Sequence, residues 1–181
     1  MEPGNLKLQR EGNGKEREKS QLKWEALSVK EKSKKENEEN KQNKQNKGLI
    51  FAIDFDGTCV THEYPELGVD IGAVSVLKKL TDLGHKIILY TMRSGEPLKQ
   101  AVEWFEDRNI PLWSINHNPT QAFWTVSPKI YADYYIDDAA IGTPLVRGQH
   151  HREFVDWNQM AYELYRITGD ESFIYIYKDG Y

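Results

Sequence analysis

Acidic, hydroxyl and basic side chains follow three short apolar runs of the sequence. Residues 54–58 (DFDGT) follow LIFAI, residues 91–93 (TMR) follow KIILY, and the pair Asp137-Asp138 follows DYYI. Lys129 lies a few residues before the last of these runs. Carboxylate oxygens are ligands that Mg²⁺ takes, and a carboxylate can form a covalent aspartyl-phosphate. These residue types therefore indicate phosphate chemistry at a magnesium site.

The acidic pair in DFDGT has the spacing that this chemistry needs. Asp54 is the candidate nucleophile, and together with Asp138 it could supply carboxylates to Mg²⁺. Asp56 lies two residues further on, which returns its side chain to the same side of an extended chain. It could protonate the leaving oxygen and then deprotonate the attacking water. Gly57 permits a turn tight enough for backbone N–H groups to approach phosphate oxygens.

Three further side chains are candidates for binding the substrate phosphate. Thr91 and Lys129 would hold the remaining phosphate oxygens, because phosphoryl transfer depends mainly on positioning and charge stabilisation. Arg93, two residues after Thr91, could contact the substrate or could form a surface salt bridge, and the sequence leaves both open.

The apolar runs alternate between strand and helix patterns. Strands are expected at 49–55, 85–91, 111–116 and 133–138, and helices at 71–84, 96–110 and 152–170. Residues 172–178 (SFIYIYK) indicate a last strand or a tail that packs on a neighbour. Repeated strand–helix–strand units predict a three-layer α/β/α, Rossmann-like fold around a parallel sheet. Ligands bind such sheets beyond the carboxyl ends of the strands, where the candidate residues fall.

These segments resemble the signatures of the haloacid dehalogenase (HAD) superfamily. FAIDFDGT (51–58) is similar to its first motif, IILYTMR (87–93) to its second, and SPKIYADYYIDD (127–138) to its third and fourth combined. The resemblance runs from about residue 49 to residue 146, with all four motifs in order. It implies a phosphatase that acts through an aspartyl-phosphate, with Mg²⁺ as cofactor.

The resemblance also assigns roles to single residues. It implies that Asp54 is both nucleophile and metal ligand, and that Asp56 is the acid/base whose backbone carbonyl also binds the metal. Asp138 would be a direct metal ligand, with Asp137 behind it in the metal site. Thr91 and Lys129 would bind the phosphate.

The intervals between the motifs are too short for the cap domains that this superfamily often inserts. The interval from Thr58 to Thr91 holds one loop, one helix and one strand, and the interval from Thr91 to Lys129 holds one helix, a short strand and a loop. A capless site needs another cover, which could be a large substrate, a second subunit or a loop. Candidate loops are the flap at 61–68 (THEYPELG) and the segment around Phe123 and Trp124, although the favoured interpretation of both aromatics is that they fill the core.

Composition divides the chain into two parts. Residues 1–48 carry 13 Lys or Arg and 9 Glu, a net charge of +4, and are expected to be a disordered Lys/Glu/Asn-rich tail. Residues 49–181 carry 11 basic and 19 acidic residues, a net charge of −8, and form the expected hydrolase domain. The sequence shows no signal peptide and no apolar span of about 18 residues, so no membrane partner is expected. The single cysteine, Cys59, excludes an internal disulfide and is expected to be buried, and a cytoplasmic location is expected.

Other functions stay open. The open site and the basic tail fit removal of a 3′ phosphate from a polynucleotide end, although the acidic domain disfavours nucleic acid as a partner. A non-catalytic binding module of HAD fold is a second alternative, and a homo-oligomer could cover the site. His62 and Glu63 could touch a leaving group but are expected to be solvated, and the adjacent His150 and His151 are expected on the surface.

Overall fold

The computed structural model describes residues 48–148 and 152–179. The expected disordered tail, apart from its last residue Gly48, lies outside the described residues, and so do His150 and His151. Residues 47–181 form one compact unit, and everything below concerns that unit.

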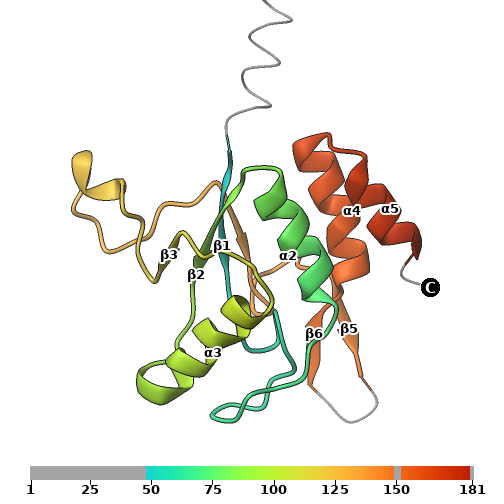
Figure 1. Cartoon of the computed structure of the whole chain (residues 1–181), viewed down its shortest axis with the longest axis horizontal. Coiled ribbons are helices and arrows are strands. Elements are labelled where there is room, and N and C mark those ends of the chain that lie inside the picture. Colours follow the sequence, from blue (N-terminus) through green and yellow to red (C-terminus); the bar gives the residue numbers. More distant parts are fainter. Residues whose placement is uncertain (1–47, 149–151, 180–181) are drawn as a thin grey trace, which may run out of the picture. The chain divides into compact units, whose positions relative to one another are not determined.

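The central sheet has four parallel strands in the order β3-β2-β1-β4 (Figure 1). These strands are β1 (Ile50–Ile53), β2 (Lys86–Leu89), β3 (Ser114–Ile115) and β4 (Tyr134–Ile136). Ala52 in β1 is paired with Ile88 of β2 on one side and with Tyr135 of β4 on the other. Because the strands are parallel, their carboxyl ends share one edge, so segments 54–58, 91–93 and 137–138 leave the sheet at that edge. The predicted parallel α/β fold is confirmed.

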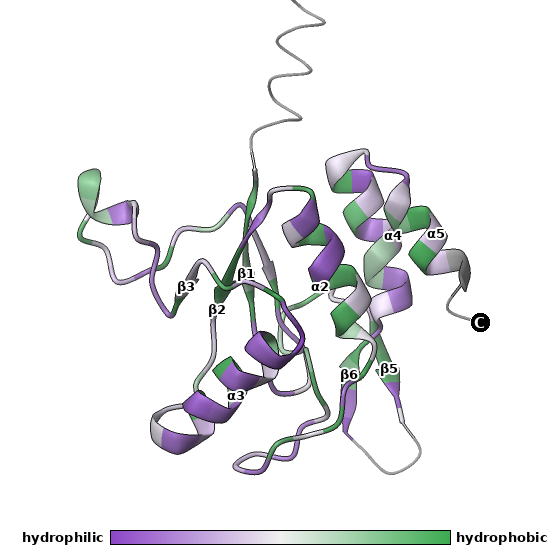
Figure 2. Cartoon of the chain, viewed as in Figure 1, coloured by the Kyte–Doolittle hydropathy of each residue, from purple (hydrophilic) through white to green (hydrophobic). Residues whose placement is uncertain are grey.

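Four α-helices contribute to the main core. They are α2 (Ala73–Asp82), α3 (Gly95–Asp107), α4 (Trp157–Thr168) and α5 (Ser172–Asp179). Their buried side chains form one apolar cluster with alternate residues of the sheet, including Phe51, Ile53, Leu89 and Ile136. Figure 2 shows hydrophobic residues along β1 and β2 and a mixture of hydrophobic and hydrophilic residues around α2 and α3. These helices have one apolar side because only that side packs on the core.

The opposite face of the sheet carries the other set of alternating residues. Ala52 and Ile88 are buried there. Tyr135 on this face donates its hydroxyl to the carbonyl of Ile130 and accepts the N–H of Ala132. The segment 116–133, which includes the 3₁₀ helix η1 (Gln121–Phe123), therefore packs against this face.

The aromatic residues of that segment differ from the favoured expectation. Phe123 is 88% exposed and Trp124 is 63% exposed, so the interpretation that they fill the core is wrong. Trp124 packs edge-on against Tyr131 at the surface instead. The side chain of Gln121 holds the segment in place by donating to the carbonyls of Ser127 and Lys129.

The helix predicted from residue 152 begins later. Strand β5 (Leu145–Arg147) pairs with β6 (Glu153–Val155) in an antiparallel hairpin, and α4 starts only at Trp157. The carboxylate of Asp156 fixes this start, because it accepts the backbone N–H groups of Asn158 and Gln159. The end near Gly169 is confirmed, with Gly169 in the left-handed conformation at φ 74°.

The last predicted strand is wrong, because residues 172–179 form α5. Phe173, Ile176 and Tyr177 pack on the core, and they are spaced as one side of a helix. Asp170 stabilises the start by accepting the N–H and the hydroxyl of Ser172. Packing against α2 and α4 therefore outweighs the strand preference of the aromatic and β-branched residues.

No domain is inserted between the motifs, and all residues of both intervals are described. Residues 58–91 contain a loop, α2 and β2, and residues 91–129 contain α3, β3 and η1. The site at the carboxyl edge therefore has no cap domain above it. Among the described residues, no helix has the length and apolar character needed to cross a membrane.

Candidate active site

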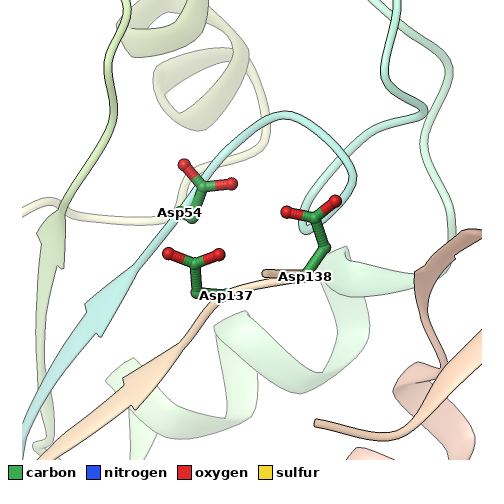
Figure 3. A group of neighbouring side chains, drawn as sticks. All are labelled: Asp54, Asp137 and Asp138. Atoms are coloured by element: carbon green, nitrogen blue, oxygen red, sulfur yellow. The ribbon is translucent and has the colours of Figure 1, made fainter. Parts of the chain in front are cut away.

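Three carboxylates meet where β1 and β4 end. Ligand oxygens of Asp54, Asp137 and Asp138 all lie within 4.8 Å of one another. Figure 3 shows Asp54 directly after β1 and the other two directly after β4, with their carboxyl groups extending to the same side. They meet because β1 and β4 are hydrogen-bonded neighbours in register, and the N–H of Asp54 itself donates to the carbonyl of Ile136. A hard dication such as Mg²⁺ binds carboxylate oxygens of this kind, so the donor set fits that metal.

Thr58 joins the two sides of this Asp cluster. Its hydroxyl donates to Oδ2 of Asp54 over 3.1 Å and accepts the backbone N–H of Asp138 over 3.1 Å. Its carbonyl accepts the indole N–H of Trp157 over 2.6 Å, which anchors the loop to α4. Thr58 is fully buried, so this arrangement is protected from water.

Gly57 lies in a tight turn, and its own N–H donates to the carbonyl of Val60 over 2.7 Å. The approach of other backbone N–H groups of this turn to a phosphate stays a prediction. The φ of Gly57 is +78°, and a Cβ atom at this position would lie 2.5 Å from Oδ2 of Asp138. Glycine is therefore needed because the loop passes close beside the Asp138 carboxylate.

Burial and neighbouring charges favour the protonated form of Asp54 in the metal-free protein. Removal from water, followed by the nearby charges of Asp137 and Asp138, raises the pKa of Asp54 from 3.8 to about 7. Hydrogen bonds from the backbone of Phe55 and the hydroxyl of Thr58 oppose this shift. A bound dication would reverse the balance, because it favours the charged carboxylate.

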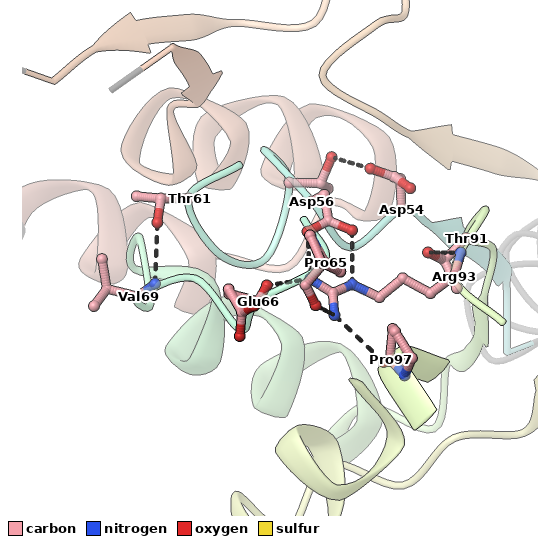
Figure 4. A network of polar contacts seen from close by, with 10 residues as sticks. Asp54, Asp56, Thr61, Pro65, Glu66, Val69, Thr91, Arg93 and Pro97 are labelled. Atoms are coloured by element: carbon pink, nitrogen blue, oxygen red, sulfur yellow. Dashed lines mark hydrogen bonds and ion pairs between the residues drawn. The ribbon is translucent and has the colours of Figure 1, made fainter. Parts of the chain in front are cut away.

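The guanidinium of Arg93 holds Asp56. Nε of Arg93 donates to Oδ2 of Asp56 and Nη2 donates to Oδ1, both over 2.7 Å (Figure 4). The Arg93 side chain has no exposed surface, and that of Asp56 is 12% exposed. Both oxygens of the predicted acid/base therefore already accept hydrogen bonds. Of the two roles that the sequence left open, the surface salt bridge is wrong, because the guanidinium of Arg93 is buried among protein acceptors. The substrate contact stays a prediction.

Arg93 also fastens the flap to the site. Its Nη2 donates to the carbonyl of Glu66 over 2.7 Å, and its Nη1 donates to the carbonyls of Pro65 and Pro97. The guanidinium lies 5.5 Å from the ring centre of Tyr64. One side chain thus connects the DFDGT loop, the predicted flap and the first turn of α3 (Figure 4).

Thr91 lies at the end of β2 as expected for a phosphate-binding residue. Its hydroxyl accepts the N–H of Arg93, and its own proton remains available for donation. The side chain of Asn116 fixes its backbone, because it accepts the N–H of Thr91 and donates to its carbonyl. Thr91 is largely buried, with 8% of its surface exposed.

Lys129 is not brought into contact with the Asp cluster. It lies exposed between η1 and β4, and its ammonium group makes no ion pair with a described acid. Its backbone carbonyl accepts a hydrogen bond from Gln121, which fixes the main chain there.

Arg152 is the cation that contacts the cluster. Its Nη2 lies 3.4 Å from Oδ2 of Asp138. Burial raises the pKa of Asp138, and the charge of Arg152 opposes that rise. The charge of His62 acts on Asp138 in the same direction, although His62 and Glu63 are exposed as expected. No sequence pattern indicates a role of Arg152 in the site, because the sequence predicts a helix from residue 152 where the structure has the β5–β6 hairpin.

Sequence reasoning also missed the residues that support the site. Asn116 and Trp157 act through hydrogen bonds to Thr91 and Thr58, and both come from segments without a motif. The role of Thr58 between Asp54 and Asp138 was missed as well, although its place in the DFDGT segment could have indicated it. Cys59, the next residue, is buried as predicted, and burial raises the pKa of its thiol.

A groove of about 820 Å³ lies elsewhere, between α3 and the β3 edge. Its walls are mainly apolar and include Val102, Ile110, Pro111, Leu112 and Trp113. It lacks the grouped carboxylates found at the carboxyl edge. Chemistry therefore favours the open edge, rather than this groove, as the candidate active site.

The chain resembles one solved structure in both sequence and fold. No protein-family model and no curated protein matches it. The solved structure is described as that of a conserved protein from Bacteroides thetaiotaomicron, and it is 33% identical with a TM-score of 0.54. The match covers 71% of this chain and 98% of the other. The chain therefore belongs to the same family as this conserved Bacteroides thetaiotaomicron protein.

Proposed function

We propose that the protein is a Mg²⁺-dependent phosphomonoester hydrolase of HAD type. The observation that carries the proposal is the meeting of Asp54, Asp137 and Asp138 at the ends of β1 and β4, with ligand oxygens within 4.8 Å of one another. The sequence resemblance to the HAD motifs agrees with it. Mg²⁺ bound to these carboxylates would neutralise charge on the phosphoryl group.

In the proposed reaction, a carboxylate oxygen of Asp54 attacks phosphorus. The new P–O bond gives an aspartyl-phosphate, and the bond to the leaving oxygen breaks. Asp56, which has to be protonated at the start of the cycle, hands its proton to that oxygen and later takes one back from the attacking water. The oxygen of this water bonds to phosphorus, the bond between phosphorus and Asp54 breaks, and inorganic phosphate leaves. Because Arg93 occupies one acceptor position on each oxygen of Asp56, these transfers have to use the lone pairs that remain.

Thr58 and Thr91 would position the reacting groups. The hydroxyl of Thr58 donates to Oδ2 of Asp54 and would hold this carboxylate in position for the attack. Thr91 can donate its hydroxyl to a phosphate oxygen at the end of the neighbouring strand. Such positioning accounts for much of the catalysis in phosphoryl transfer.

The test is hydrolysis of p-nitrophenyl phosphate with Mg²⁺, with EDTA, and by Asp54→Asn. We expect activity that needs Mg²⁺ and that falls at least a thousandfold in Asp54→Asn, because the nucleophile is lost. Asp107→Asn, an exposed acid at the end of α3, is the matched control and should keep full activity. Hydrolysis that survives both EDTA and Asp54→Asn would exclude the proposal.

A further inference from the structure

The β5–β6 hairpin is attached directly to the candidate active site. The N–H of Val155 in β6 donates to the carbonyl of Gly57 over 2.9 Å. Figure 1 shows the hairpin projecting from the end of the sheet at which β1 and β4 stop. Arg152 immediately precedes β6, so its guanidinium is brought to the Asp cluster by the main chain that forms this hairpin.

Arg152 differs from the other basic residues around the site. Among the described residues, it is the only Lys or Arg with an ion pair to a member of the cluster. Arg93 is occupied by Asp56, and Lys129 has no acidic partner among described residues. The Arg152 side chain is 59% exposed, whereas that of Asp138 is 8% exposed. Arg152 therefore reaches the carboxylate from the solvent side, and burial does not hold its guanidinium in place.

Arg152 and a metal would compete for the same carboxylate, that of Asp138. The guanidinium lies 3.4 Å from Oδ2 of Asp138, on the carboxylate that would bind Mg²⁺. A cation bound to Asp138 would weaken this ion pair by repulsion and would leave the guanidinium beside the metal. A phosphate ester entering the site brings negative charge next to three carboxylates, so a nearby cation in addition to the metal would favour its binding. Guanidinium groups suit phosphate because two parallel N–H donors match two of its oxygens.

We propose that Arg152 is a substrate-binding residue, whose guanidinium leaves Asp138 when the cation binds and donates to non-bridging oxygens of the phosphoryl group. This inference rests on the proposed phosphatase function. It assigns to the β5–β6 hairpin part of the phosphate binding that the sequence ascribed to Lys129.

A simpler role for Arg152 is to neutralise Asp138, and the two roles differ in what they do to phosphate and to Mg²⁺. A residue that only neutralises Asp138 affects the metal alone. Its removal tightens Mg²⁺ binding, because a competing cation is lost, and leaves phosphate affinity unchanged. A substrate-binding residue affects phosphate in the metal-loaded protein.

The experiment measures binding of inorganic phosphate to the full chain at saturating Mg²⁺ by isothermal titration calorimetry. A second titration measures Mg²⁺ without phosphate. The variants are Arg152→Gln, Arg152→Lys and Arg147→Gln. Arg147 is the matched control, because it belongs to the same hairpin, is 75% exposed and pairs with Glu153 rather than with the cluster.

We expect Arg152→Gln to weaken phosphate binding by roughly ten- to a hundredfold, the usual effect of losing a charged hydrogen-bonding partner. Arg152→Lys should recover part of the lost phosphate affinity, and Arg147→Gln should bind phosphate as tightly as the wild type. In the second titration, Mg²⁺ should bind to Arg152→Gln at least as tightly as to the wild type. Phosphate affinity equal to wild type in Arg152→Gln would overturn the inference and leave the proposed function standing. A wild-type protein that binds Mg²⁺ but no phosphate would overturn both.

Discussion

The ion pair between Asp56 and Arg93 is buried, and this decides what a substitution there does. Loss of Arg93 would leave the Asp56 carboxylate and the carbonyls of Pro65 and Glu66 without their donors. Breaking a buried pair by removing one partner costs about 3–5 kcal/mol, because an uncompensated charge remains. We therefore expect Arg93→Met to lower the free energy of unfolding by about that amount in urea titrations.

The control for this prediction is an exposed arginine. Arg166 pairs with Glu163 on the surface of α4, and its side chain is 62% exposed. Exposed pairs contribute about 0–1 kcal/mol, so Arg166→Met should change stability little. Equal losses in the two variants would mean that the buried pair contributes no more than a surface pair.

The sequence predicted the acidic residues of the site better than their partners. Asp54 and the Asp137-Asp138 pair could be found because each follows an apolar run that forms a strand. The partner of Arg93 could not be found, since Asp56 lies 37 residues away in sequence and meets it only in the folded sheet. For the same reason, the sequence could not decide between a surface salt bridge and a substrate contact for Arg93.

The raised pKa of Asp54 predicts how stability depends on pH in EDTA. Its pKa is about 7 in the folded chain and about 3.8 when unfolded. Between these values the folded chain holds a proton that the unfolded chain has released, so this group contributes stability that is lost as the pH rises from about 4 to 7. Asp54→Asn removes the titration, so the wild type should lose stability relative to this variant between pH 5 and pH 7.5.

Urea unfolding at both pH values measures that difference, which we expect on the order of 2–4 kcal/mol. Comparing wild type with Asp54→Asn cancels the other groups that titrate in this range, such as His85, whose pKa burial lowers. A constant difference between the two proteins at pH 5 and pH 7.5 would contradict the prediction.

At the level of the elements, Asp156 marks the boundary between β6 and α4. Its carboxylate accepts the N–H groups of Asn158 and Gln159, which would otherwise lack partners at the helix start. Asp156→Ala should therefore lower the free energy of unfolding by about 0.5–2 kcal/mol, measured by urea titration. Asp156→Asn keeps an oxygen at the same position and should stay near wild type. An equal loss in both variants would show that charge, rather than capping, stabilises this boundary.

The C-terminal elements show where reading by local pattern fails. Residues 152–155 were assigned to a helix because apolar residues follow at helical spacing, but pairing with β5 makes Glu153–Val155 a strand. Residues 172–178 indicate a last strand or a tail that packs on a neighbour, but burial of Phe173 and contacts with α2 and α4 accompany a helix there. Both errors arise from contacts with segments distant in sequence. The strands β1 and β2 could be predicted because each contains a run of at least three consecutive apolar residues.

The arrangement of the whole sheet explains why three carboxylates come together at one place. Strand β4 is an edge strand, paired only with β1, and two of the three acids follow it directly. Mutual repulsion at that position opposes the pairing of β1 with β4 in the metal-free protein. The predicted parallel order put the acids at one edge, but the sequence could not say that β1 and β4 would be neighbours, on which the cluster depends.

A metal bound by all three acids would connect the ends of β1 and β4, so Mg²⁺ should stabilise the fold. A ligand that binds only the folded state adds about 2.7 kcal/mol to the free energy of unfolding at a concentration 100 times its Kd.

Asp137→Asn should change its order of stability relative to the wild type between the two buffers. In EDTA it removes repulsion between carboxylates, whereas at saturating Mg²⁺ it removes a metal ligand. We expect this variant to be more stable than wild type in EDTA and less stable at saturating Mg²⁺. Thermal unfolding in the two buffers tests this, with Asp107→Asn as a control that should follow the wild type in both. An Asp137→Asn variant with the same Mg²⁺-dependent rise as wild type would show that Asp137 does not bind the metal and that the ions bridge the strands through Asp54 and Asp138 alone.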